Sequence, residues 1–121
     1  MGDAMFCVFP AGSENKVVEC SLKLRAAFSD LVNRKGLPSG TELEVGIDSG
    51  EVAMGVFGHK SLKQRDVFGE EVNRAVTIGH HRGIAITERV YERVKMDNET
   101  RRLPDLRVKW QDEPLKVWEV A

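Results

Sequence analysis

The chain has 121 residues, with 18 lysines and arginines against 19 aspartates and glutamates, and its formal net charge is −1 at pH 7. This length is enough for one domain with its own core, and 41% hydrophobic with 31% charged residues is ordinary for a soluble globular protein. A charge so close to zero argues against a general nucleic-acid binder, which needs cationic side chains to neutralise phosphates, and no apolar run reaches the length of a membrane span.

The first segment, residues 4–9, is apolar on both faces, which predicts a central strand covered from both sides. It lacks a positively charged start and follows Asp3, so it does not have the pattern of a signal peptide. Cys7 lies in this segment and Cys20 in the next, both on predicted apolar faces. Because no metal-ligand spacing surrounds them, we interpret both as structural thiols in a reducing cytoplasm, in preference to a disulfide or a metal site.

A helix is predicted over residues 13–35. Ser13 is a plausible N-cap, and Glu14 stands in the first turn, where a negative charge complements the helix dipole. Gly36 and Pro38 are strong stop signals. One apolar stripe recurs at helical spacing, formed by Val17, Cys20, Leu24, Ala27, Phe28 and Leu31.

A hairpin is predicted over residues 43–57. Leu43, Val45 and Ile47 alternate with polar or small residues, which is the period of a half-buried strand. Residues 48–50 supply turn chemistry, and residues 52–57 form the predicted return strand. Ala53 and Gly55 on that strand would let a neighbouring backbone or a ligand come close.

The second half predicts alternating short elements. A basic loop with Lys60, Lys63 and Arg65 leads to a short strand and then to a helix that begins at Glu70 and ends at a glycine, 79 or 83. Residues 83–87 predict a strand, residues 87–95 a two-turn helix capped by Thr87, and residues 106–120 a terminal hairpin that turns at 111–114. This order of elements predicts an α+β fold.

Two blocks of the sequence resemble the signature of class III nucleotidyl cyclases. The first, residues 45–58, reads Val-Gly-Ile-x-Ser-Gly-x-Val-x-x-Gly-Val-x-Gly. The second, residues 66–75, carries Asp-Val-Phe-Gly followed by Val-Asn-x-Ala. The resemblance extends over nearly the whole chain and implies one partial cyclase domain over residues 1–121. Its fold would be the ferredoxin-like cyclase core without its first strand, two helices and second strand, since Gly2 and Asp3 stand where the family's turn into a later strand should be.

The resemblance implies an enzyme that converts a nucleoside triphosphate into a 3′,5′-cyclic monophosphate and pyrophosphate. Two divalent ions, Mg²⁺ or Mn²⁺, would activate the attacking oxygen and hold the phosphates. Asp3 matches the second of two metal-binding aspartates, and the first belongs to the strand that this chain lacks. A plain turn aspartate after Gly2 is an equal alternative for Asp3.

The resemblance also assigns substrate contacts. Asp66 matches a position that contacts the purine, where a carboxylate accepts from an exocyclic amine and so favours adenine; the alternative is a strand-edge aspartate that binds local amides. Asn73 matches the residue that orients the ribose. Lys109 matches loosely a lysine that reaches the phosphates, and a solvated strand lysine is at least as good an interpretation.

One family position departs from the pattern. Four residues after Asn73, on the same helix face, the family usually has an arginine that stabilises charge on the reacting phosphate, and here the residue is Thr77. A hydroxyl does not replace a fixed cationic fork. His80, seven residues after Asn73, returns to the same helix face and could substitute for the arginine, as could Arg82 beyond the helix. A solvated helix end is the favoured interpretation of both.

We therefore expect a cyclase domain that forms cyclic AMP from ATP in its intact parent, while this fragment alone is inactive. Family active sites form between two subunits, so the expected partners are ATP or GTP and a second copy, as a homodimer or a swapped oligomer. The alternative is a non-catalytic cyclase-like module that dimerises or senses a nucleotide. An RNA-binding or protein-binding ferredoxin-like domain is disfavoured by the net charge and by the lack of aromatic strand motifs.

Overall fold

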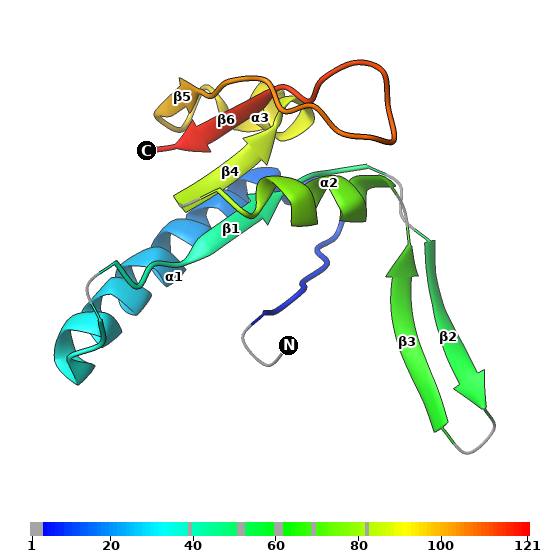
Figure 1. Cartoon of the computed structure of the whole chain (residues 1–121), viewed down its shortest axis with the longest axis horizontal. Helices are drawn as coiled ribbons and strands as arrows, with labels where there is room; N and C mark the ends of the chain where they lie inside the picture. Colours follow the sequence, from blue (N-terminus) through cyan, green and yellow to red (C-terminus); the bar gives the residue numbers. More distant parts are fainter. Residues whose placement is uncertain (1–3, 39, 51–52, 60–61, 69, 82) are drawn as a thin grey trace.

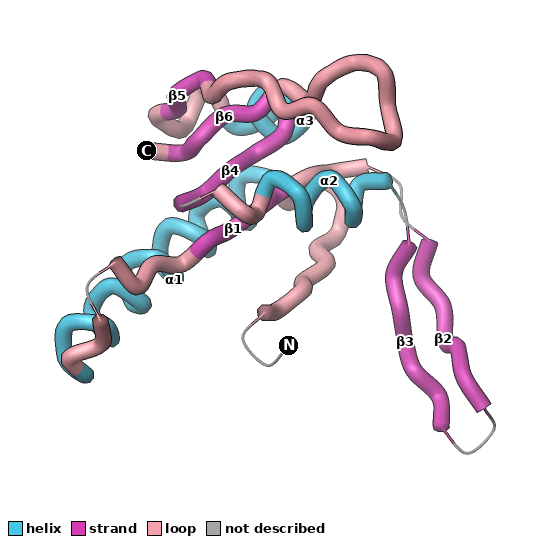
Figure 2. Tube along the Cα trace, viewed as in Figure 1, coloured by secondary structure: helices cyan, strands magenta, loops and turns pink. Residues whose placement is uncertain are grey.

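The computed structural model describes residues 4–38, 40–50, 53–59, 62–68, 70–81 and 83–121. Its elements, in chain order, are α1 (Glu14–Lys35), β1 (Glu44–Ile47), β2 (Ala53–His59), β3 (Leu62–Phe68), α2 (Glu70–Ile78), β4 (Gly83–Thr87), α3 (Glu88–Val94), β5 (Thr100–Arg102) and β6 (Val117–Val120). They form a four-stranded sheet in the order β1-β4-β6-β5 and a separate two-stranded sheet, β2-β3 (Figures 1 and 2). The predicted α+β class is confirmed.

The four-stranded sheet is mixed. β1 runs parallel to β4, with Val45 opposite Ile84, whereas β6 runs antiparallel to both β4 and β5. Alternate residues of β4 face opposite sides of this sheet. Ile84 and Ile86 pack in one core cluster with residues of α1 and α3, while Ala85 packs in a second cluster with Ile78 of α2. The helices therefore cover both faces of the sheet, α1 and α3 on one and α2 on the other.

Helix α1 has the predicted bounds but not the predicted buried face. Gly36 ends it in the left-handed conformation, at φ 62°, and donates its N–H to the carbonyl of Val32. The residues that it buries are Val18 and Ser21. Of the predicted stripe, Cys20, Leu24, Ala27 and Leu31 are exposed. The apolar surface of the helix is wider than the sheet and α3 cover, so part of it faces outward.

The prediction of a central strand over residues 4–9 is wrong. These residues are irregular and exposed, and 80% of the surface of Met5 is accessible to solvent. A strand needs a neighbour for its backbone hydrogen bonds, and none of the described strands pairs with this segment. Cys7 and Cys20 are free thiols and both are exposed, so the expectation that they lie on buried apolar faces is wrong.

The two strands of the predicted hairpin do not pair with each other. β1 pairs with β4 and not with the return strand, which instead pairs as β2 with β3, Ala53 opposite Phe68. The segment interpreted as a basic loop is therefore mostly strand, since Lys63 and Arg65 belong to β3, while Lys60 lies outside the described residues. Figure 1 shows the β2–β3 hairpin extending away from the four-stranded sheet.

Helix α2 lies unusually close to β1. A Cβ atom on Gly46 of β1 would stand 2.1 Å from the carbonyl oxygen of Ala75 and 2.7 Å from the amide nitrogen of Gly79. Only a glycine allows the helix backbone to approach the strand in this way. This contact holds α2 flat against the sheet.

The C-terminal region is confirmed in part. β4 and α3 have close to the predicted bounds, and Val90 and Val94 of α3 are fully buried. The terminal hairpin is reduced to one bridge between Leu106 and Leu115, and β6 pairs instead with β4 and β5. β5 was not expected from its polar sequence. Among the described residues, no helix has both the length and the apolar character to cross a bilayer.

Candidate functional site

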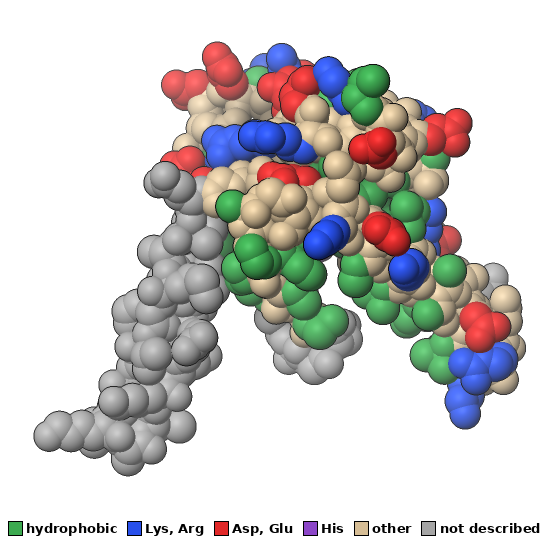
Figure 3. Space-filling view, turned by 180° about the vertical axis from the view of Figure 1, so that it is seen from behind, with side chains coloured by type: hydrophobic (Ala, Val, Ile, Leu, Met, Phe, Trp, Pro, Cys, Tyr) green, Lys and Arg blue, Asp and Glu red, His purple; other side chains and the backbone are tan. Residues whose placement is uncertain are grey.

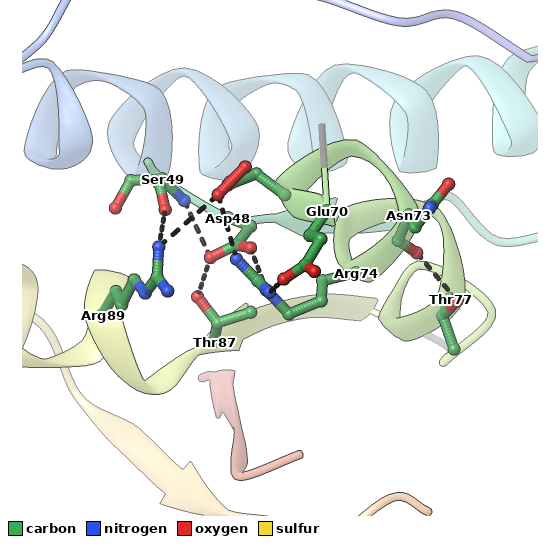
Figure 4. Close-up of polar contacts among 9 residues, drawn as sticks. Asp48, Ser49, Glu70, Asn73, Arg74, Thr77, Thr87 and Arg89 are labelled. Atoms are coloured by element: carbon green, nitrogen blue, oxygen red, sulfur yellow. Dashed lines mark hydrogen bonds and ion pairs between the residues drawn. The ribbon is translucent and has the colours of Figure 1, made fainter. Parts of the chain in front are cut away.

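The candidate site residues Asp66 and Asn73 lie on consecutive elements. Asp66 is in β3, opposite Gly55 of β2, two residues before the strand ends at Phe68. α2 then begins at Glu70 and carries Asn73 in its first turns. Asn73 is exposed, and Figure 4 shows its side chain on the outer side of the helix. Its amide can both donate and accept a hydrogen bond, as contact with a ribose hydroxyl requires.

Thr77 lies one helical turn after Asn73. Its hydroxyl donates to the backbone carbonyl of Asn73 over 2.8 Å, so it already has a partner within the helix (Figure 4). This bond is the local one that threonine commonly makes in helices. The position at which a cation was expected from the family pattern thus carries a hydroxyl turned back to its own helix.

An open groove of about 300 Å³ lies beside the end of α2. Most of its lining residues are apolar; the full set is Thr77, Ile78, His80, His81, Leu103, Pro104, Leu106 and Val117. His81 already has a hydrogen-bond partner, because its Nε2 lies 2.7 Å from Oε2 of Glu119. His80 is exposed and Arg82 lies outside the described residues, so neither is placed as a substitute for the missing arginine.

Lys109 and Asp3 are the remaining candidates from the family pattern. Lys109 is exposed in the loop closed by the Leu106–Leu115 bridge, a different part of the chain from α2. Asp3 lies outside the described residues. Among the residues that are described, no three histidine, cysteine, aspartate or glutamate side chains lie together as a metal ion would need.

A buried ion pair between Asp48 and Arg74 was missed by sequence reasoning, which assigned Asp48 only to a turn. Nε of Arg74 donates to Oδ2 of Asp48 over 2.7 Å, and the two side chains are 8% and 1% exposed (Figure 4). Oδ1 of the same carboxylate accepts from the hydroxyl of Thr87 and from the amide of Ser49. The carboxylate is thus bound on both oxygens at the end of β1.

Further acidic groups surround the guanidinium of Arg74. Nη1 lies 3.4 Å from Oε2 of Glu70, and Nη2 lies 3.3 Å from Oε1 of Glu71 without being aligned to donate a hydrogen bond. Burial acts to lower the pKa of Arg74, but the hydrogen bond to Asp48 and the charges of Asp48, Glu71 and Glu70 outweigh it and raise the pKa above the usual range of an arginine. Arg74 is therefore a permanent cation inside the fold.

A sequence signal for this pair existed. Arg74 stands four residues before Ile78, a buried position, so it shares the core-facing side of α2. An arginine on such a face needs a buried acidic partner. The sequence alone does not identify that partner among 19 acidic residues.

A family model described as the adenylate and guanylate cyclase catalytic domain matches residues 1–119. None of the curated proteins compared with the chain matches it.

Solved cyclase structures share the fold. The adenylyl cyclase CyaB from P. aeruginosa superimposes with a TM-score of 0.78 at 21% identity, over 89% of this chain and 58% of that one. The guanylyl cyclase Cya2 superimposes with a TM-score of 0.75 at 22% identity, over 93% of this chain and 59% of that one. The guanylate cyclase domain of RhGC from Catenaria anguillulae was solved in complex with GTP. It superimposes with a TM-score of 0.60 at 20% identity, over 84% of this chain and 59% of that one. The chain thus spans somewhat under three fifths of the length of these structures.

Proposed function

This chain belongs to the adenylate and guanylate cyclase catalytic domain family, and from that premise we propose that it supplies the base and ribose contacts of a domain that forms cyclic AMP and pyrophosphate from ATP. The observation that supports this most directly is the run from β3 into α2. Asp66 and Asn73, the two residues that match the family's substrate contacts, stand seven positions apart on either side of that junction. Asn73 is exposed there and can meet a ligand.

The two residues have separate roles in this proposal. The carboxylate of Asp66 accepts from the exocyclic amine of adenine, whereas guanine presents a carbonyl at the same position, which cannot donate. The amide of Asn73 binds the ribose, which is common to both nucleotides. Lys109 would bind the phosphates, and Asp3 would hold Mg²⁺ or Mn²⁺; both assignments stay predictions, as does a cytoplasmic location.

A non-catalytic, nucleotide-binding role is the second candidate. Its support is the hydroxyl of Thr77, which is bonded to the carbonyl of Asn73 where the family pattern has a cation. Without a fixed cation at that place, charge on a reacting phosphate would lack a stabilising partner. A chain of this kind would bind the nucleotide without turning it over.

We also propose that the chain pairs with a second copy. Large apolar side chains are exposed both on the N-terminal segment and on α1, among them Phe6 at 52%, Phe9 at 46% and Leu24 at 43%. Figure 3 shows hydrophobic side chains gathered along α1 and the N-terminal segment, on the side away from the sheet. Apolar surface of this kind favours association.

Nucleotide binding by the wild-type chain and two variants tests the proposal. We expect ATP to bind more tightly than GTP. Placing the guanine carbonyl against the Asp66 carboxylate brings two acceptors together without a donor, which costs about 1–3 kcal/mol, or roughly ten- to hundred-fold in affinity. Asp66→Ala should shrink the ATP-to-GTP ratio, while Asn73→Ala should weaken both nucleotides alike. Titration followed by NMR measures both effects. A folded Asp66→Ala chain with an unchanged ratio would remove Asp66 from base recognition.

Turnover tests whether the chain is active by itself. The isolated chain, incubated with ATP or GTP and Mg²⁺ or Mn²⁺, should release no cyclic nucleotide, because Thr77 carries a hydroxyl where the family pattern has a cation. Turnover that disappears in Asp3→Ala would overturn this expectation and would make the chain an enzyme by itself.

A further inference from the structure

The β2–β3 hairpin joins the core at two points that lie side by side. The chain leaves the core after β1, at Asp48 and Ser49, and returns to it at Glu70, where α2 begins. Beyond these points the hairpin extends away from the four-stranded sheet (Figure 1). Whatever holds the two points together therefore decides the direction in which the hairpin, with Asp66, leaves the core.

Two arginines bridge these points. Arg74 of α2 binds Asp48 on the outgoing side through Nε, at 2.7 Å, and lies 3.3 Å from Glu71 on the returning side. Arg89 of α3 makes a parallel bridge, since its Nη1 donates to the carbonyl of Ser49 over 3.3 Å and lies 3.7 Å from Oε1 of Glu71 (Figure 4). Each arginine thus contacts both the outgoing and the returning chain.

Gly50 shows how closely the two chains approach. Its φ is 152°, and a Cβ at this position would stand 2.5 Å from Cγ of Glu71 and 2.8 Å from Nη1 of Arg89. The backbone of the outgoing chain therefore lies directly against the side chains that bridge it to α2. The packing at this point leaves no room for even a methyl group unless those side chains move.

We propose that Asp48, Glu71, Arg74 and Arg89, here named the hairpin-base clamp, orient the β2–β3 hairpin relative to α2 and so position Asp66 with respect to Asn73. The four are positioning residues, because they act on the proposed site through the two chains that they join. The roles of Asp66 and Asn73 rest on the proposed function, whereas the orientation of the hairpin does not.

The expected loss of nucleotide affinity follows from the fraction of molecules that hold the binding-competent arrangement. A ligand that needs Asp66 and Asn73 in one fixed arrangement binds with an affinity reduced by the fraction of molecules that hold this arrangement. If loss of the clamp leaves the hairpin in the competent direction about a tenth of the time, affinity for nucleotide falls about ten-fold.

A distance measurement tests the clamp without any nucleotide. Spin labels are attached at Lys63→Cys in β3 and Lys16→Cys in α1, in a chain whose two exposed cysteines are replaced by serine, and double electron–electron resonance records the distance distribution. We expect a narrow distribution in the reference chain. Arg89→Gln and Glu71→Gln should each broaden it, and Arg89→Lys, which keeps the charge, should broaden it less.

The control is Arg34→Gln, which breaks the exposed pair between Arg34 and Asp30 on α1, far from the hairpin in sequence, and should leave the distribution unchanged. Arg89 and Glu71 are preferred to Arg74 for this test because the Arg89 side chain is 58% exposed, so its loss should leave the chain folded. An Arg89→Gln, Glu71→Gln double variant that is folded and keeps the narrow distribution would overturn the proposal.

Nucleotide affinity supplies the second readout. If the wild-type chain binds ATP, Arg89→Gln should weaken that binding about ten-fold with no loss of helix content. If the wild-type chain binds no nucleotide, the proposed function fails, and the distance distributions still decide whether the clamp orients the hairpin. If Arg89→Gln broadens the distribution but leaves affinity for ATP unchanged, the clamp does not position the site, and that part of the proposal is wrong.

Discussion

The Nε of Arg74 lies 2.7 Å from Oδ2 of Asp48, and this pair joins α2 to the end of β1 across 26 positions of sequence. The carboxylate is 1% exposed and also accepts from Thr87 at the end of β4. One buried carboxylate therefore links two strands and a helix on the side of the sheet where α2 packs. A buried pair of this kind contributes little over an apolar replacement, but it makes the loss of either partner costly.

Removing one partner of this pair should destabilise the chain strongly. We expect Arg74→Met to lower the free energy of unfolding by about 3–5 kcal/mol, because it leaves the Asp48 carboxylate buried without its cation. Urea denaturation measures the loss. The matched control, Arg34→Gln, breaks an exposed pair on α1 and should cost less than about 1 kcal/mol. Similar costs for the two variants would show that the buried pair is not a structural link.

The contact between Gly46 and α2 should be sensitive to one methyl group. Gly46→Ala places a Cβ 2.1 Å from the carbonyl oxygen of Ala75, so helix and strand must separate. We expect a loss of about 1–3 kcal/mol in the free energy of unfolding, as for other overpacked contacts.

Gly79→Ala is the matched control for this contact, because its Cβ would stand 3.0 Å from the same carbonyl oxygen. It should cost less than Gly46→Ala in the same denaturation experiment. If the two variants are equally stable, the approach of α2 to β1 is looser than the structure indicates.

Low pH should weaken the contacts of Glu119 with His81 and Arg101. His81 is its main partner, and the hydrogen bond from it lowers the pKa of the Glu119 carboxyl below 4.5; burial opposes this, and Arg101, at 2.6 Å, adds to the lowering. A lowered pKa means that the unfolded chain takes up the proton first as the pH falls. The stabilisation by Glu119 is therefore complete above pH 4.5 and is lost as the pH falls through the folded-state pKa.

Glu119→Gln tests this dependence. The difference in unfolding free energy between wild type and Glu119→Gln should be largest near neutral pH and should shrink below pH 4.5. Glu99→Gln, which removes the charge of an exposed carboxylate just before β5, is the control for the loss of a charge alone. A constant difference between wild type and Glu119→Gln over this range would contradict the assignment.

Self-association should depend on the outward face of α1. Sedimentation should show a dimer or larger species at micromolar concentration, and Leu24→Lys with Leu31→Lys should shift it toward monomer, since both side chains are exposed and lysine is a good helix former. Met96→Lys changes an apolar side chain that is 86% exposed beyond α3, and it should leave the assembly unchanged. A wild-type chain that is monomeric at this concentration would refute the proposed pairing.

The sequence by itself determined the elements whose signals are local. Gly36 and Pro38 end α1 where predicted, and the apolar run of β4 and the helix start at Glu70 follow from neighbouring residues alone. The cyclase signature is likewise a property of short blocks with fixed spacing, so the family was predictable. Asn73 could be placed on the outside of α2 from helical periodicity and motif position.

Only the tertiary structure decided which elements meet. The alternation of residues 43–47 predicts a strand but does not name β4 as its partner, and the stripe of α1 does not say which half of it a sheet will cover. Arg74 and Asp48 find each other because β1, β4 and α2 are brought together by packing of the whole chain. Local propensity depends on neighbours in sequence, whereas strand pairing, helix rotation and buried ion pairs depend on which distant surfaces become buried against one another.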